Sequence, residues 1–167
     1  MDIGRIARHL LEPGHRVRRA FPARARDAIG TAIRQSEGLH RGEIRFAVEG
    51  ALSLPSLMHG VTPLQRAREV FASLGVWDTA ENNGVLIYLL LADRDVEIVA
   101  DRGIHERVGI GGWESICREM EAEFRVGRFE EGVLRGISAV SAILAAQFPA
   151  IAGRGNPNEL PDAPAIL

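Results

Sequence analysis

Two stretches of the sequence hold side chains that can bind a cation or transfer a proton. Residues 77–83 read Trp-Asp-Thr-Ala-Glu-Asn-Asn and precede a continuous apolar run, and residues 101–106 read Asp-Arg-Gly-Ile-His-Glu and follow the next apolar run. Carboxylate and amide oxygens are the ligands that Ca²⁺ and Mg²⁺ prefer, and an imidazole favours a transition metal. An arginine beside them can bind a phosphate group with two parallel hydrogen bonds. The candidate metal ligands are Asp78, Asn82, Asn83, Asp101 and His105, and the candidate phosphate clamp is Arg102.

A predicted hairpin has to position these two stretches. Residues 84–92 are continuously apolar, as expected of a strand that is buried on both faces of a sheet. Residues 96–100 form the next strand and contain a single charge. The connection between the two strands is short, which is typical of an antiparallel hairpin. The start of the first strand and the end of the second therefore lie at the same edge of the sheet.

The register of the hairpin decides which residues meet. Pairing of Ala92 with Asp95 across the turn places Asn83 opposite Ile104, next to the candidate histidine. Loops held on a rigid sheet are where functional residues concentrate. We therefore expect the candidate site at this edge.

The opposite edge of the sheet is the competing location. Ligands of open α/β sheets usually bind outside the carboxyl ends of parallel strands, a rule that favours Glu49, Gly50 and residues 93–95. The turn there is short for a pocket, so the first edge is preferred.

The remaining periodicities complete a mixed sheet with helices. Residues 43–49 alternate between apolar and polar positions, as in a half-buried strand, and Pro63 begins a helix after them. This strand–helix–strand unit predicts a right-handed parallel crossover. Further helices are predicted before it and, on either side of Gly127, after the hairpin. The expected fold class is α/β, a three-layer sandwich whose mixed central β-sheet has helices on both faces.

Composition excludes several classes of protein. The 167 residues carry a net charge of −2, which gives no indication of nucleic-acid binding. The single cysteine, Cys117, permits neither an intrachain disulfide nor a zinc site of several cysteines, and it falls on the apolar stripe of a predicted helix. All 20 basic residues are arginine, which excludes Schiff-base chemistry at a lysine and a P-loop lysine. No secretory signal and no membrane-spanning run is recognisable, so a cytoplasmic protein is expected.

Charge is uneven along the chain. Residues 1–34 hold eight arginines and three acidic residues, whereas the rest holds twelve arginines and nineteen acidic residues. The basic segment can contact an anionic surface, or its arginines can pair with the acidic body of the protein.

Residues 76–106 resemble the TPM domain, a family that includes a thylakoid-lumen phosphatase-like protein, photosystem-II repair factors and an acetylcholine-receptor modulator. In that family Asp-Asn-Gly-Val-Leu opens a strand, and a Gly-x-Gly-Leu-Glu turn follows the next strand. The corresponding segments here read Asn-Asn-Gly-Val-Leu and Asp-Arg-Gly-Ile-His, and the resemblance extends over about residues 25–148. Asn82 stands where the family has Asp, Asp101 replaces the first Gly, and His105 stands where the family has Glu.

The resemblance implies an α/β sandwich with a mixed sheet and a place in the short, soluble bacterial branch of the family. It also implies binding of a divalent cation (Ca²⁺, Mg²⁺ or Mn²⁺) and acid phosphatase activity. The clustered oxygen ligands and the lack of a nucleophile motif lead us to expect a role in envelope or stress maintenance through a protein partner. The expected organisation is a basic helical arm over residues 1–21, a TPM-like α/β domain over residues 22–149 and a flexible C-terminal tail over residues 150–167.

Three functions remain open. The first is a divalent-cation-binding module that acts through protein partners. The second is a metal-dependent phosphatase, in which Asp101 or Asp78 holds the metal, His105 is the general acid and Arg102 binds the phosphate. The third is an interaction module that places the basic arm on an anionic membrane or an acidic partner.

Overall fold

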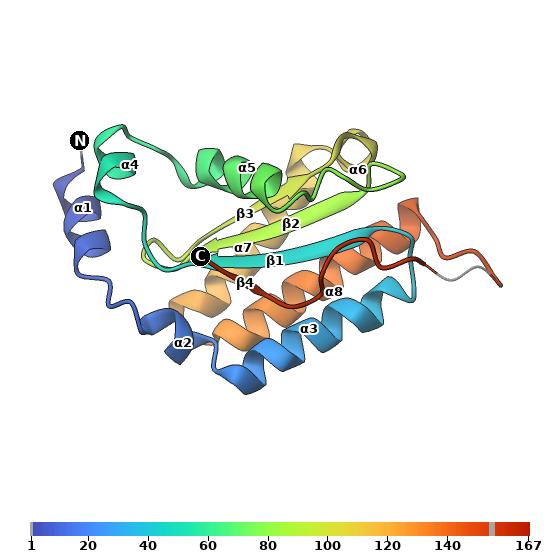
Figure 1. The fold of residues 1–167 in the computed structure, drawn as a ribbon, viewed down its shortest axis with the longest axis horizontal. Coiled ribbons are helices and arrows are strands. Elements are labelled where there is room, and N and C mark those ends of the chain that lie inside the picture. Colours follow the sequence, from blue (N-terminus) through green and yellow to red (C-terminus); the bar gives the residue numbers. More distant parts are fainter. Residues whose placement is uncertain (1, 154–155) are drawn as a thin grey trace.

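Helices cover both faces of a four-stranded sheet in the computed structural model, which describes residues 2–153 and 156–167 (Figure 1). The strands are β1 (Glu43–Glu49), β2 (Gly84–Leu90), β3 (Asp95–Ala100) and β4 (Ala165–Ile166), in the order β3-β2-β1-β4. β1 and β2 are parallel, and β2 and β3 are antiparallel, as the crossover and the hairpin predict. The expected fold class, a three-layer α/β sandwich with a mixed central sheet, is confirmed.

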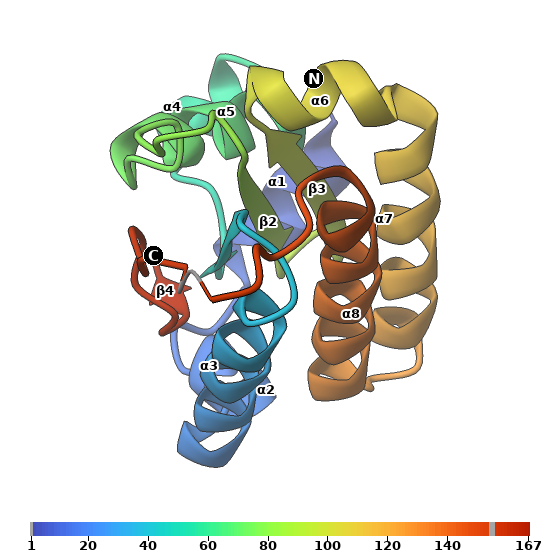
Figure 2. The same cartoon turned by 90° about the vertical axis from the view of Figure 1, so that its right-hand side faces the viewer.

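The helices form two layers and two end groups (Figures 1 and 2). One face of the sheet is covered by α3 (Ala23–Glu37), α7 (Ile110–Arg125) and α8 (Phe129–Gln147). The other face carries α5 (Pro63–Ser73) and the short helix α4 (Leu54–Met58). At one end of the sheet lie α1 (Ile3–Leu10) and α2 (Arg16–Ala20), and at the other end lies α6 (Arg102–Val108). No helix in the described ranges combines the length and the apolar character needed to cross a membrane.

Local signals explain where the helices begin and end. α5 starts at a capping box in which the Thr62 hydroxyl accepts from the Gln65 amide and the Gln65 side chain accepts from the Thr62 amide. The chain leaves α5 through Gly75 and turns between α7 and α8 at Gly127, and both glycines have a positive φ that L-residues rarely adopt. The break predicted at Gly127 is confirmed.

The core is divided by the alternation of β1 and β2. Phe46 and Ile87 point toward the three-helix layer, whereas Leu86 and Tyr88 point toward α5. Every residue of β2 is buried, as its continuous apolar sequence predicts. β1 was expected to be half-buried, but its residues from Glu43 to Val48 are all buried. The reason is that the C-terminal segment covers the side of β1 away from β2.

The hairpin register differs by two residues from the expected one. Leu90, not Ala92, pairs with Asp95, so Val85 faces Ala100. Leu91 and Ala92 instead donate backbone hydrogen bonds to the chain that continues from β1, at 2.9 and 3.0 Å. These two residues belong to the turn, which spans residues 91–94 and is therefore longer than the sequence suggested. Arg94 completes the turn with a φ of 53°.

The expectation of a flexible C-terminal tail is not met over residues 156–167. β4 pairs in parallel with β1, and the side chains of Leu160 and Asp162 are buried. The Arg45 guanidinium donates hydrogen bonds to the carbonyl oxygens of Pro161 and Ala163. Composition gave no sign of this packing because the anchors of the segment lie on a strand more than a hundred residues earlier.

Candidate functional site

The two chemistry-bearing stretches meet at the amino end of β2. The Asp101 amide donates to the carbonyl oxygen of Gly84 at 2.9 Å. Gly103 lies so close to the preceding loop that a Cβ there would stand 2.6 Å from the Asn82 carbonyl oxygen and 2.9 Å from that of Glu81. Only a glycine permits this approach, because any side chain would collide with fixed backbone. Figure 1 shows α6 beside the loop that leads into β2.

Asn83 is the most buried member of the site. Its backbone amide donates to the Thr79 hydroxyl at 3.1 Å, and its side-chain Nδ2 donates to the Arg41 carbonyl oxygen at 2.8 Å. Its Oδ1 is also buried and accepts no hydrogen bond from any described residue. The neighbouring Asn82 is exposed and has a φ of 52°, a left-handed conformation that asparagine tolerates. The turn therefore fixes a carbonyl-type oxygen with unused acceptor capacity.

Asp101 holds a second unused oxygen. Its Oδ1 caps α6 by accepting from the Arg102 amide at 2.7 Å. Its Oδ2 is buried and has no hydrogen-bond partner among the described residues. A buried acceptor without a donor destabilises the folded protein by about 1–3 kcal/mol. Two such oxygens on adjoining loops fit the donor chemistry of a hard divalent cation.

The other predicted site residues are placed less centrally. Asp78 is exposed, and its side chain has no hydrogen bond or ion pair with any described residue. Arg102 is exposed on the first turn of α6. His105 is half-buried and lines a groove beside β3. Over residues 2–153 and 156–167 no three His, Cys, Asp or Glu side chains are grouped to hold a metal, so a cation here would depend on amide or backbone oxygens as well.

Arg41 is a residue of this site that the sequence did not point to. Its guanidinium forms an ion pair with Glu81 and donates to the Pro149 carbonyl oxygen at 3.1 Å, while its own carbonyl oxygen accepts from Asn83. Arg41 thus ties the site loop to the end of α8. No motif marks it, because its partners are 40 or more residues away in the sequence.

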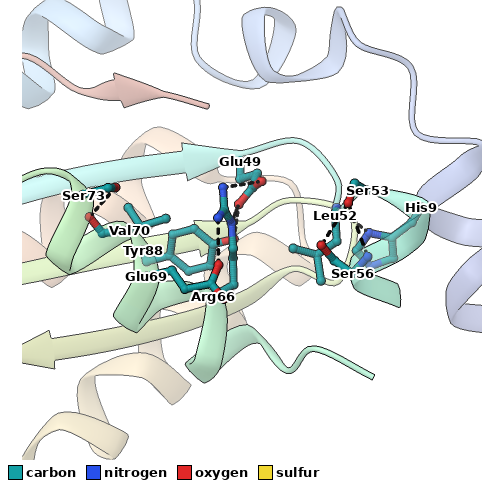
Figure 3. Close-up of polar contacts among 10 residues, drawn as sticks. All are labelled: His9, Glu49, Leu52, Ser53, Ser56, Arg66, Glu69, Val70, Ser73 and Tyr88. Carbon is teal, nitrogen blue, oxygen red and sulfur yellow. Dashed lines mark hydrogen bonds and ion pairs between the residues drawn. The ribbon is translucent and has the colours of Figure 1, made fainter. Parts of the chain in front are cut away.

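The opposite edge of the sheet is filled by α1. Arg5 Nε donates a hydrogen bond to the Asp93 carboxylate at 2.9 Å, and Arg8 and His9 Nε2 lie 3.3 and 3.1 Å from the same carboxylate. His9 is buried, and its Nδ1 accepts from the Leu52 amide at 3.0 Å (Figure 3). Two arginines of the basic arm are therefore paired with the body of the protein at the edge that the parallel-strand rule favoured.

A second network at that edge surrounds Glu49 (Figure 3). Arg66 of α5 donates to both carboxylate oxygens, at 2.8 and 3.2 Å, and the Tyr88 hydroxyl donates at 2.6 Å. Burial and the hydrogen bond to Glu49 raise the pKa of Tyr88 far above its ordinary value. Both oxygens of the Glu49 carboxylate therefore accept hydrogen bonds within the protein. The role of this carboxylate is structural, because it joins β1, β2 and α5.

Comparison with known proteins places the chain in a family. A family model described as the TPM domain matches residues 18–143. The chain belongs to the TPM domain family. The solution NMR structure of the BA42 protein from the psychrophilic bacterium Bizionia argentinensis is 30% identical to this TPM domain, with a TM-score of 0.76, and the match covers 88% of this chain and 95% of that one.

A more distant match shows the fold alone. It is the solution NMR structure of the N-terminal domain of a protein from P. gingivalis, with 22% identity, a TM-score of 0.59, and coverage of 75% of this chain and 77% of that one. No curated protein sequence matches the TPM domain described here. The α/β sandwich expected from the resemblance is thus shared with solved structures.

Proposed function

We propose that this TPM domain binds a divalent cation where the loop of residues 78–83 meets Asp101, and that it acts through a protein partner. The observation that carries the proposal is the pair of buried, unpartnered oxygens, Asn83 Oδ1 and Asp101 Oδ2. A bound cation would supply positive charge that neutralises Asp101 and satisfies both oxygens. Ca²⁺ is the preferred ion, because it tolerates amide and backbone ligands and irregular geometry better than Mg²⁺ does.

The residues of this chain have separate tasks in that arrangement. Asp101 supplies the charge while its other oxygen still caps α6, so the helix holds the carboxylate in place. Asn83 supplies a neutral oxygen held by its bond to the Arg41 carbonyl. Gly103 keeps the two loops in contact. His105 lines the β3 groove, so the proposal does not depend on its imidazole.

The test is a CaCl₂ titration of ¹⁵N-labelled protein, with a parallel titration of an Asp101→Asn variant. The amides of residues 82–84 and 101–103 are expected to shift first, and the variant is expected to bind at least about tenfold more weakly, because one full charge is lost at the ion. Asparagine caps a helix as well as aspartate does, so the variant keeps α6. Asp27→Asn is the matched control, because it removes the same charge from an exposed position on α3. Equal shifts in all three proteins, or none in the wild type, would contradict the proposal.

Phosphomonoester hydrolysis is the second candidate function, because Arg102 lies exposed directly beside Asp101 with His105 one turn further along α6. In this alternative Asp101 orients the water that attacks phosphorus, Arg102 binds the phosphate oxygens, and His105 protonates the oxygen of the alcohol that leaves. Turnover of para-nitrophenyl phosphate is compared between wild type and Asp101→Ala. Loss of turnover in the variant supports the alternative, and equal rates in both assign the activity to a contaminant.

A further inference from the structure

β3 is the edge strand of the sheet on the side away from β4 (Figure 2). The Asp101 amide, directly after β3, donates to the Gly84 carbonyl oxygen of β2, so the backbone groups of Asp101 face β2. Along an antiparallel strand the residues alternate between facing the partner strand and facing away from it. It follows that the amide and carbonyl groups of Val96, Ile98 and Ala100 face away from β2. No described strand pairs with this outer edge. Edge strands with free backbone groups are templates for pairing with another chain.

A groove of about 630 Å³ runs along this free edge. α5 packs on one side of β3 and α7 on the other. All six residues of β3 line the groove, together with side chains from both helices: Leu64, Arg68, Ile110, Trp113, Glu114, Cys117, Arg118 and Glu121. The groove therefore combines a strand edge with two helical walls, which is the form that receives an extended peptide.

The lining of the groove is acidic on balance. Asp95 and Glu97 line it without an opposite charge in direct contact among the described residues, whereas Glu114 pairs with Arg118 at 3.8 Å and Glu121 pairs with Arg125 at 3.1 Å. Asp95 Oδ1 is buried and accepts no hydrogen bond from any described residue. Burial is the main cause that raises the pKa of Glu97 to about 7 and that of Asp95 to about 6. Repulsion among the carboxylates adds to both shifts, and the charges of Arg68 and Arg5 oppose them at Glu97 and Asp95 respectively. An incoming positive charge would relieve this repulsion.

Trp113 offers a donor in the same groove. Its side chain is 4% exposed, and its indole Nε1 is buried without an acceptor among the described residues. Tryptophan N–H groups usually find a partner when buried. The backbone carbonyl oxygen of a bound peptide could accept the hydrogen bond that this N–H group does not make within the described chain.

We propose that an extended segment of a partner protein, with arginine or lysine alternating with small apolar residues, adds as a strand to the outer edge of β3 in this groove. The inference rests on the partner half of the proposed function and does not require the cation. The basic side chains of the segment face Asp95 and Glu97, and its apolar side chains lie on the α7 side beside Ile98 and Trp113.

Other occupants fit less well. The C-terminal segment of this chain lies at the opposite edge of the sheet, where β4 pairs with β1. A second copy of the chain that paired β3 with β3 would bring the Glu97 carboxylates onto the same face of a shared sheet, and like charges across two strands are destabilising. A basic segment from another protein avoids both difficulties.

The test uses a set of capped, fluorescent hexapeptides in which Arg alternates with Val, Ala or Thr. Members of the set are expected to bind with a Kd of about 1 mM or tighter and to shift the amides of Val96, Ile98 and Ala100. Peptides with Glu in place of Arg are the charge control. Two further peptides carry N-methyl groups on alternate amides, one on each edge of the strand. Strand addition predicts that one of these two loses binding and the other keeps it.

Protein variants complete the design. Glu97→Gln is expected to weaken the Arg peptides about threefold, whereas Glu119→Gln, an exposed position on α7 outside the groove, is expected to leave them unchanged. Peptide binding is measured in CaCl₂ and again in EDTA. Equal affinity in both is expected and shows that peptide binding in the groove does not depend on the cation, so the two proposals are tested independently. The proposal is overturned by a set that does not bind, by equal loss from both N-methyl peptides, by equal binding of Glu peptides, or by a dimer whose interface contains the β3 amides.

Discussion

Glu37 makes the stability of this protein depend on pH. Its carboxyl group is buried where α3 ends and β1 begins, and its Oε1 accepts from the Ile44 amide at 3.2 Å. Burial, together with repulsion from the nearby carboxyl groups of Glu43 and Asp162, raises the pKa of Glu37 to about 8. The hydrogen bond from Ile44 and the charge of Arg34 oppose this shift. Burial likewise raises the pKa of Glu43 to about 7. Both groups therefore stay protonated in the folded protein at pH values where they ionise in the unfolded chain.

The direction of the effect follows from proton binding. Between the unfolded pKa of 4.5 and the folded pKa of about 8, the folded state binds more protons through Glu37 than the unfolded state does. The free energy of unfolding therefore falls as pH rises through this window, with a slope of up to about 1.4 kcal/mol per pH unit for this group. Between pH 5.5 and 7.5 the contribution of Glu37 alone amounts to as much as about 2.7 kcal/mol.

The assay is urea unfolding at intervals from pH 5 to 8, compared between wild type and Glu37→Gln. Glutamine keeps the acceptor for Ile44 and cannot ionise, so the variant should match the wild type near pH 5 and exceed its stability increasingly toward pH 8. Glu131→Gln, an exposed position on α8, should follow the wild type throughout. A wild-type curve parallel to that of Glu37→Gln at all pH values would refute the reasoning.

Three further predictions concern the ion-pair networks and the cysteine. Tyr88→Phe removes the hydrogen bond to the Glu49 carboxylate and should lower the free energy of unfolding, measured by urea denaturation, by about 1.5–3 kcal/mol. An unchanged free energy would show that the bond is not formed in solution. Asp93→Ala removes the carboxylate that holds α1, so the amides of residues 6–10 should exchange with deuterium faster while those of β2 keep their protection. Unchanged exchange in α1 would contradict the claim that Asp93 anchors this helix. Burial raises the pKa of the Cys117 thiol to about 12, so alkylation by iodoacetamide in the folded protein should be far slower than after denaturation, and equal rates would show an exposed thiol.

Much of the fold follows from periodicity in the sequence. The apolar run of β2, the alternation of β1, the proline that begins α5 and the glycine between α7 and α8 predict elements that the structure contains. The meeting of the 77–83 and 101–106 stretches was also predictable, because any short antiparallel turn brings them together. The register was not, because Leu91 and Ala92 pair with the β1 side instead of with β3.

The contacts that sequence could not supply join residues far apart in the chain. β4 has only two residues, and Arg45 holds the segment before it through hydrogen bonds to backbone carbonyl oxygens. In the sequence, Arg45 is one of the polar positions of an alternating strand, which predicts only that it faces solvent. His9 is buried because α1 docks on Asp93, a contact that no motif announces. The β3 groove did leave a signal. Asp95 and Glu97 interrupt an otherwise apolar strand, and charged residues are common on the edge strands of sheets.

The most direct measurement of the central claim is a crystal structure grown with MnCl₂ and recorded near the manganese absorption edge. The cation proposal predicts an anomalous peak within bonding distance of Asp101 Oδ2 and Asn83 Oδ1, at about 2.1–2.4 Å. The same crystals of the Asp101→Asn variant should show no peak or a much weaker one. Manganese bound elsewhere, with these two oxygens hydrogen-bonded to ordered water, would contradict the account.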